Sequence, residues 1–375
     1  MRIINNYLLA KFLAFKRRLY ILVFGEFDPY PDNPKKFSFS PSEFNQYESE
    51  NIITKYGLKK DTIDINNWKL RSKKKYSELL RIKNNLYFKI IHETSMPIKK
   101  NFDRKRIYIE FSKFRHAPID IISKKSSSFN HIVICMQGTN SGAHLNLDEI
   151  RMPADVKKVI NGSGLAIQAV EEGYLAVSYE RIGFGERREQ KLNINKNNSQ
   201  TIYESERATS FHSLLLGNTL LGETVKELML ITRWLKKEYN NKIIWLVGYS
   251  AAGTTALAAA TVDDNIDGVA VGGCVGFSKE TILKRVSSGL NTIPNMMEWL
   301  DYDAQIALIS PKPCIIIAGE NDHIWPYKGA QEVVNSFKKI YKIDNSKNNL
   351  MLIKGLRGHA YYPDLMWPEV AKFLK

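Results

Sequence analysis

Cysteine is scarce in this sequence of 375 residues, and so are the patterns in which cysteine usually acts. The three cysteines are Cys135, Cys274 and Cys314, and each lies in an apolar run without metal-ligand or Cys-x-x-Cys spacing. An odd number in such surroundings argues against a disulfide framework and against a zinc module. We therefore expect three reduced cysteines in the core of a globular protein.

Glycine and proline are also few, at 22 and 13 residues, whereas 44% of the residues are hydrophobic and 25% are charged. Disordered and low-complexity chains have fewer apolar groups, so this composition excludes them. The length exceeds that at which one hydrophobic core usually stops growing. We expect one large, enzyme-sized domain with an appendage, and we exclude a small binding module.

A long apolar run is missing as well. The most apolar N-terminal segment is Tyr7–Phe24, and its longest uninterrupted stretch is Leu19–Phe24. That is far short of the roughly 20 residues that a membrane-spanning helix needs, and no small-residue cleavage site follows. Four basic residues interrupt the segment: Lys11, Lys16, Arg17 and Arg18. We expect an amphipathic helix packed on the body of a cytoplasmic protein, with attachment to a membrane surface as the alternative.

Acidic residues are in short supply only in the first third of the chain. Residues 1–128 hold 27 Lys and Arg against 13 Asp and Glu, and the rest of the chain is nearly balanced, although the formal net charge is +15. The Lys-rich segment Lys69–Lys75 has few aromatics among its charges and no binding motif, so it predicts a solvated helix face and no nucleic-acid partner. We interpret residues 1–105 as a basic, mainly helical N-terminal extension or cap.

From residue 106 to residue 375, short β-rich runs alternate with helical patterns, which is typical of an α/β protein. Arg106–Phe114 and Pro118–Ser123 alternate in polarity and predict two antiparallel edge strands. Continuous apolar runs predict buried parallel strands: His131–Met136, Tyr174–Ser178, Ile243–Val247, Gly268–Val275, Cys314–Ala318 and Leu350–Ile353. Helical patterns lie between them: Gly164–Glu172, Thr224–Tyr239, Ala251–Val262, Lys328–Tyr341 and Leu365–Leu374. The order predicts a mostly parallel, doubly wound sheet.

The clearest chemical signal is the hexapeptide from Gly248 to Gly253, with Ser250 in its third position. It directly follows one predicted strand and opens the next predicted helix, as a nucleophile elbow does. Small residues must flank a serine on such a sharp turn, and Gly248 and Ala252 meet that need. The Gly-x-Ser-x-Gly pattern is not matched literally, because Ala252 holds its last position. We expect Ser250 to be a nucleophile.

A serine hydroxyl needs a base, which in this arrangement follows an acid in the chain. Asp322 comes just after the strand Cys314–Ala318, and His359 follows the last strand, so both lie where sites collect in open α/β sheets. Asp322 would orient His359, and His359 would move the proton of Ser250. His323 stays open as an alternative base, and Asp301 and Asp303 stay open as alternative acids. The remaining candidates are expected to be structural: His92, His116, His131 and His212.

Acyl transfer also needs hydrogen-bond donors for the developing oxyanion. We expect one to be the backbone N–H of Ala251, at the positive end of its helix. The other should come from the loop Gln137–Gly142, where we choose the N–H of Thr139. Three side chains near this loop are candidates for lining the pocket: Gln137, Asn140 and His144. The loop lacks the spacing of a phosphate or dinucleotide site, and no cluster has metal-ligand spacing, so we expect no cofactor and no metal.

Five further segments add a resemblance to a known family: Gln137–Gly142, Arg181–Arg187, Leu215–Glu223, Ala307–Pro313 and Gly358–Pro363. With the elbow, acid and histidine in order, the chain after about residue 105 resembles the α/β-hydrolase superfamily, and more narrowly its acetyl xylan esterase and dienelactone hydrolase-like branch. The resemblance implies a serine hydrolase with Ser250, Asp322 and His359 as its triad, and implies nothing about the N-terminal third. Gln137 departs from the pattern, because many relatives have histidine there.

Three functions are open at this point. The first is a carboxylic-ester hydrolase working on a small-molecule ester, such as an acetyl or carbohydrate ester, through an acyl-enzyme. The second is a peptidase of the prolyl oligopeptidase type, although residues 1–105 are too few for the large β-propeller that such enzymes usually carry. The third is a non-catalytic binding protein, whose mark would be loss of the triad residues.

Overall fold

The computed structural model describes residues 2–25, 37–57, 64–82, 85–99, 101–189, 201–285 and 288–374. The chain divides into two compact units, residues 1–44 and residues 45–375. The first unit contains α1 (Arg2–Phe24), and α2 (Pro41–Asn51) crosses the boundary. The predicted N-terminal helix is therefore present, and its packing stays a prediction. None of the described helices is long and apolar enough to cross a membrane.

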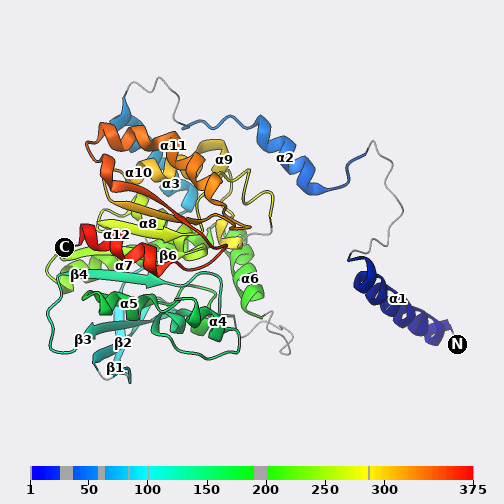
Figure 1. The fold of residues 1–375 in the computed structure, drawn as a ribbon, viewed down its shortest axis with the longest axis horizontal. Coiled ribbons are helices and arrows are strands. Elements are labelled where there is room, and N and C mark those ends of the chain that lie inside the picture. The colour runs from blue at the N-terminus through cyan, green and yellow to red at the C-terminus, as the bar shows by residue number, and fades with distance from the viewer. Residues whose placement is uncertain are drawn as a thin grey trace. The chain divides into compact units, whose positions relative to one another are not determined.

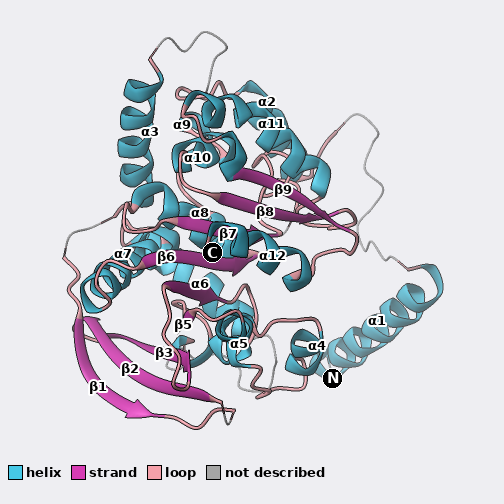
Figure 2. Ribbon diagram, turned by 60° about the vertical axis from the view of Figure 1, so that its left-hand side comes forward, coloured by secondary structure: helices cyan, strands magenta, loops and turns pink. Residues whose placement is uncertain are grey.

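The second unit is built around one sheet of nine strands in the order β1-β2-β3-β5-β4-β6-β7-β8-β9 (Figures 1 and 2). β1, β2, β3 and β5 pair antiparallel in succession, and β5, β4, β6, β7, β8 and β9 pair parallel. The strands are β1 (Lys89–Ser95), β2 (Phe102–Ser112), β3 (Arg115–Lys124), β4 (His131–Met136), β5 (Leu175–Tyr179), β6 (Ile243–Tyr249), β7 (Gly268–Gly272), β8 (Cys314–Gly319) and β9 (Leu350–Gly355). The predicted mostly parallel sheet with an antiparallel edge is thus confirmed.

Helices cover both faces of this sheet, because its central strands are apolar on both sides. In β4, Ile132 and Ile134 face one hydrophobic cluster, and Val133 and Cys135 face the other. The first cluster takes in residues of α3, α7, α8, α10 and α11, and the second takes in residues of α5 and α12. The second unit has these helices: α3 (Ile65–Leu80), α4 (Asp155–Ile160), α5 (Leu165–Glu171), α6 (Thr201–Leu215), α7 (Leu220–Glu238), α8 (Ala251–Val262), α9 (Met296–Trp299), α10 (Tyr302–Ile309), α11 (Tyr327–Ile343) and α12 (Pro363–Phe373).

Two features of the N-terminal third differ from a purely helical extension. β1 and the start of β2 lie before residue 106 and belong to the central sheet. α3 also joins the core, where Tyr76 and Leu80 are buried in the same cluster as α7 and α8. The sheet and its packing therefore begin well before the expected boundary at residue 105. The three cysteines are free and buried, as expected.

Candidate active site

Ser250 occupies the sharp turn between β6 and α8. Its backbone has φ 57° and ψ −127°, a conformation that a residue with a side chain rarely adopts and that is enriched at functional sites. The turn is held because the Ser250 N–H donates to the carbonyl oxygen of Gly272 at 2.8 Å, and the Ser250 carbonyl accepts from the N–H of Thr254 at 3.0 Å. The predicted strand, turn and helix around Ser250 are all present.

Both glycines of the elbow are required, because a side chain at either position would clash with a neighbouring group. A Cβ at Gly248 would lie 2.6 Å from the carbonyl oxygen of Ala252, and a Cβ at Gly253 would lie 2.6 Å from Cys274 Sγ. Alanine is accommodated at position 252, where it is fully buried. The glycine that comes one position later than in the usual pattern therefore makes room for Cys274 under α8.

Asp322 and His359 meet at the carboxyl ends of the neighbouring strands β8 and β9. His359 Nδ1 lies 2.7 Å from Asp322 Oδ2, and Asp322 Oδ1 accepts the N–H groups of Ile324 at 2.8 Å and Trp325 at 2.9 Å. Burial acts to raise the pKa of Asp322, but His359 and these two donors outweigh it and hold the pKa below its usual range. Because Nδ1 faces the carboxylate, Nε2 is the ring nitrogen left to face a reacting group.

The alternative acids and base lie in other surroundings. The rings of His323 and His359 are 6.2 Å apart, and His323 is exposed. Asp301 caps α10 and accepts from the hydroxyl of Ser278 at 2.7 Å, and Asp303 bonds the N–H group that follows it. The structure thus pairs His359 with Asp322 and with neither Asp301 nor Asp303.

Ser250 and His359 line one pocket with a volume of about 510 Å³. Thr139, Asn140 and Ala251, all proposed from the sequence, line the same pocket. Its lining does not include Gln137 or His144. In the part of the chain that the structure describes, no group of three or more His, Cys, Asp or Glu side chains could hold a metal ion.

The loop after β4 lies directly against the nucleophile turn. A Cβ at Gly138 would lie 2.7 Å from the carbonyl oxygen of Tyr249 and 3.2 Å from Ser250 Cβ, so only glycine permits this approach. The following peptide N–H belongs to Thr139, and the N–H of Ala251 begins α8 beside Ser250. The N–H of Thr139 thus belongs to a loop in close contact with the Ser250 turn, and the N–H of Ala251 belongs to that turn itself.

Arg181 fixes the orientation of this loop, although sequence reasoning gave it no role of its own. Its Nε donates to the carbonyl oxygen of Gln137 at 2.9 Å and its Nη2 to that of Gly138 at 3.0 Å. In a planar trans peptide the carbonyl and the next N–H point in opposite directions, so the Thr139 N–H is directed away from Arg181. Burial lowers the pKa of Arg181 to about 10, which is still well above neutral pH, so the guanidinium stays charged.

Gln137 and His144 tie the loop to neighbouring segments. The Gln137 side chain donates to Asn146 at 2.6 Å and accepts from Asn140 at 2.8 Å, and the hydroxyl of Tyr361 also donates to it. His144 Nε2 lies 2.9 Å from Asp155 Oδ2. Of the three side chains expected to line the pocket, Asn140 does so. The other two do not, and their polar atoms bond mainly to neighbouring segments: Gln137 to Asn146, Ser163 and Tyr361, and His144 to Asp155.

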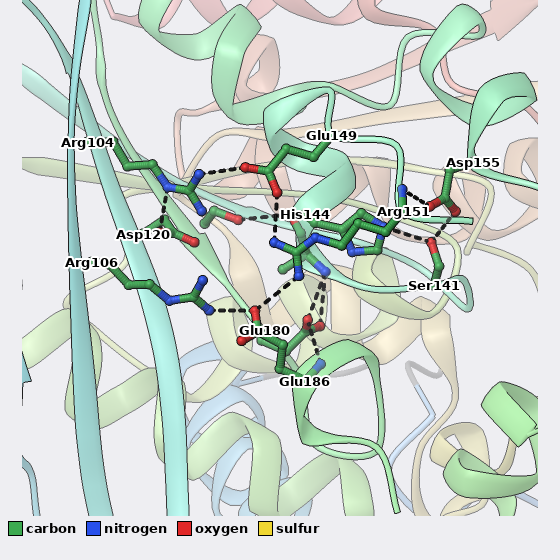
Figure 3. A network of polar contacts seen from close by, with 12 residues as sticks. Arg104, Arg106, Asp120, Ser141, His144, Glu149, Arg151, Asp155, Glu180 and Glu186 are labelled. Carbon is green, nitrogen blue, oxygen red and sulfur yellow. Dashed lines mark hydrogen bonds and ion pairs between the residues drawn. The ribbon is translucent and has the colours of Figure 1, made fainter. Parts of the chain in front are cut away.

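Glu180 ties the same loop to the segment that follows β5 (Figure 3). Both of its oxygens accept the N–H of Ala143 at 3.0 Å, and one accepts the N–H of Glu186 at 3.4 Å. Burial raises the pKa of Glu180 to about 7, against the pull of these two donors. Figure 3 shows Glu180 within a polar network in which Arg106 and Arg151 both contact Glu186.

Glu180→Gln is expected to remove a pH dependence of stability. A carboxyl whose pKa is raised on folding contributes stability that is complete below its unfolded pKa and is lost as the pH rises through the folded pKa. The unfolding free energy of the variant minus that of the wild type should therefore rise by on the order of 3 kcal/mol between pH 4.5 and 8. Urea unfolding at several pH values measures it, with the exposed Glu172→Gln as the control. A flat difference would contradict the assignment.

Comparisons with known proteins agree on the fold. No known family model matches the chain, and no curated protein matches it in sequence. Among solved structures, a provisionally assigned acetyl xylan esterase from Bacteroides fragilis superposes with a TM-score of 0.67 at 15% identity, covering 87% of this chain and 85% of that one. A methylesterase gives 0.61 at 14% identity, covering 88% and 67%, and a glucuronoyl esterase from Solibacter usitatus gives 0.55 at 11%, covering 87% and 97%. The chain has the α/β-hydrolase fold.

Proposed function

We propose that this protein is a serine hydrolase that cleaves a small carboxylic ester through an acyl-enzyme. The observation that carries the proposal is that Ser250, on its strained turn, lines one pocket with a histidine that is hydrogen bonded to a buried carboxylate. The structural neighbours named above as esterases support the ester class. Acetyl and carbohydrate esters are the substrates that their names suggest.

The reaction would run in two halves. In the first, Ser250 Oγ attacks the ester carbonyl carbon while His359 Nε2 takes its proton, and the tetrahedral oxyanion accepts the N–H groups of Thr139 and Ala251. His359 returns the proton to the departing alcohol, leaving the acyl group on Ser250. In the second half, His359 deprotonates a water that attacks the acyl carbon, and the acid leaves as Ser250 regains its proton. Asp322 holds the imidazole and stabilises its charged form.

A substrate panel tests the proposal against its two rivals. We expect hydrolysis of 4-nitrophenyl acetate and butyrate, and of an acetylated xylo-oligosaccharide or a uronate methyl ester, with no loss after exhaustive chelation. Turnover of a proline-containing peptide amide without ester hydrolysis would favour the peptidase. A folded protein that hydrolyses neither class would favour the non-catalytic reading. Activity lost on chelation and restored by zinc would mean that another mechanism operates.

A further inference from the structure

The rim of the candidate pocket, meaning the solvent-exposed part of its lining, carries three positive charges. Three basic side chains line it together with Ser250: Lys157 and Lys158 from α4, and Arg207 from α6. They come from two elements that are far apart in the sequence. Cations near the end of a helix interact favourably with its dipole, which accounts for the two lysines of α4. It does not account for Arg207, which lies in the middle of α6.

No carboxylate neutralises these three cations within the described parts of the chain. Asp155, the acid nearest in sequence to the two lysines, is taken up by the ring of His144 and by the backbone N–H groups of residues 151 and 152. None of the ion pairs between described residues includes Lys157, Lys158 or Arg207.

Glu206 is the one acidic side chain among the described residues that line the pocket, and its carboxylate is already engaged. It is buried, and it accepts from the Ser288 hydroxyl at 2.6 Å and from the N–H groups of Gly289 at 3.3 Å and Leu290 at 2.7 Å. Its charge also stabilises the buried guanidinium of Arg181. The positive charge of the rim is therefore left for something that enters the pocket.

The electrostatic surroundings of Lys158 agree with a positive rim that is free to bind an anion. Lys158 is exposed, but the protein around it still removes part of its hydration, which lowers its pKa, and the adjacent positive charge of Lys157 lowers the pKa further. An anion bound at the rim would relieve this repulsion, because like charges placed side by side without a counter-ion are unfavourable.

We infer that the ester cleaved at Ser250 carries a carboxylate of its own, which Lys157, Lys158 and Arg207 bind at the rim of the pocket. This inference rests on the proposed function and names its substrate class, an ester with a free carboxylate on either its acyl or its alcohol part. The bound carboxylate would place the ester carbonyl between Ser250 and the loop that holds Thr139. The uncharged part of the substrate would make apolar contacts with Ile324 and Trp325, which line the same pocket.

Matched esters test the inference. On the acyl side, 4-nitrophenyl hemisuccinate is compared with 4-nitrophenyl butyrate; on the alcohol side, 4-acetoxybenzoate is compared with its methyl ester. The measured quantity is the ratio of kcat/KM for the charged ester to that for the neutral one, which cancels general losses of activity. We expect this ratio to fall at least tenfold in the triple variant Lys157→Ala, Lys158→Ala, Arg207→Ala for one of the two pairs, and to fall in the wild type as salt is raised. The pair that responds identifies the side that carries the carboxylate.

A second lysine pair supplies the control. Lys338 and Lys339 are adjacent on α11 and neither lines the pocket, so their double alanine variant should keep the wild-type ratio. An unchanged ratio in the triple variant for both pairs would overturn the inference, while continued hydrolysis of the neutral esters would leave the proposed function standing.

If no ester is turned over, binding measurements distinguish a failure of the anion site from a failure of the proposed hydrolysis. Calorimetry with the Ser250→Ala protein, folded as judged by its thermal transition, measures affinity for the charged and neutral esters without chemistry. Tighter binding of a charged ester, lost in the triple variant made in the same background, would support the rim as an anion site even if the proposed hydrolysis failed. Equal binding of charged and neutral esters would refute it.

Discussion

Ser250→Ala is expected to lower kcat for 4-nitrophenyl acetate by roughly four to six orders of magnitude while the protein stays folded. The hydroxyl would form the covalent bond, but it contributes little packing, since the turn is held by backbone hydrogen bonds to Gly272 and Thr254. Some turnover above the uncatalysed rate should remain, because the donors of Thr139 and Ala251 are intact. Stopped-flow or long-time progress curves, with circular dichroism as the check on folding, measure it.

His359→Ala should lower kcat to a similar residual value, because members of such a triad act as a unit and the losses from removing them are not additive. The double variant of Ser250 and His359 should be no slower than either single one. His323→Ala is the matched control, since its exposed ring lies next to the site without bonding Asp322. Near-normal rates in His359→Ala together with a large loss in His323→Ala would mean that the base has been assigned to the wrong residue.

Glu227→Ala is expected to lower the free energy of unfolding by about 3–5 kcal/mol, the usual effect of removing one partner of a buried ion pair. Glu227 is fully buried on α7. Its carboxylate binds Arg187 through two bonds of 2.7 Å and 2.9 Å, binds Arg115 at 2.6 Å and accepts the hydroxyl of Tyr179. Without it, the buried guanidinium of Arg187 would have no compensating charge.

Urea unfolding of the wild type and the variant measures this loss. Glu238→Ala, an exposed change near the end of the same helix, should alter stability by no more than about 0.5 kcal/mol. A Glu227→Ala protein as stable as the Glu238→Ala protein would show that the buried cluster does not hold β5 and the segment after it against α7.

Much of the sheet was predictable, because a parallel strand that is buried on both faces is a continuous apolar run. The missed elements lack such a signal. β1 lies at the edge of the sheet and carries polar residues such as His92 and Glu93, and most of its positions are exposed. α10 has only eight residues and is buried nearly all round, so it shows no amphipathic period. Its sequence resembles a buried strand as much as a helix.

The residues of the candidate site also fall into those that the sequence pattern could predict and those that it could not. Ser250, Asp322 and His359 could be proposed because each follows a strand, and the carboxyl ends of parallel strands meet at one edge of a sheet. Arg181 and Glu180 act through backbone groups of the loop after β4, which is remote in sequence. Only the folded chain brings them together. The segment Arg181–Arg187 contributes to the family resemblance, but nothing in its composition indicates what the Arg181 guanidinium binds.

Labelling with a fluorophosphonate, followed by intact-mass measurement and peptide mapping, tests whether Ser250 is an activated nucleophile. We predict one adduct per folded chain, located on Ser250, absent from Ser250→Ala and formed far more slowly in His359→Ala and Asp322→Asn. Prior incubation with a substrate that acylates Ser250 should delay the adduct. A folded wild-type protein that takes up no label, or one labelled at another residue while Ser250 stays free, would contradict the account.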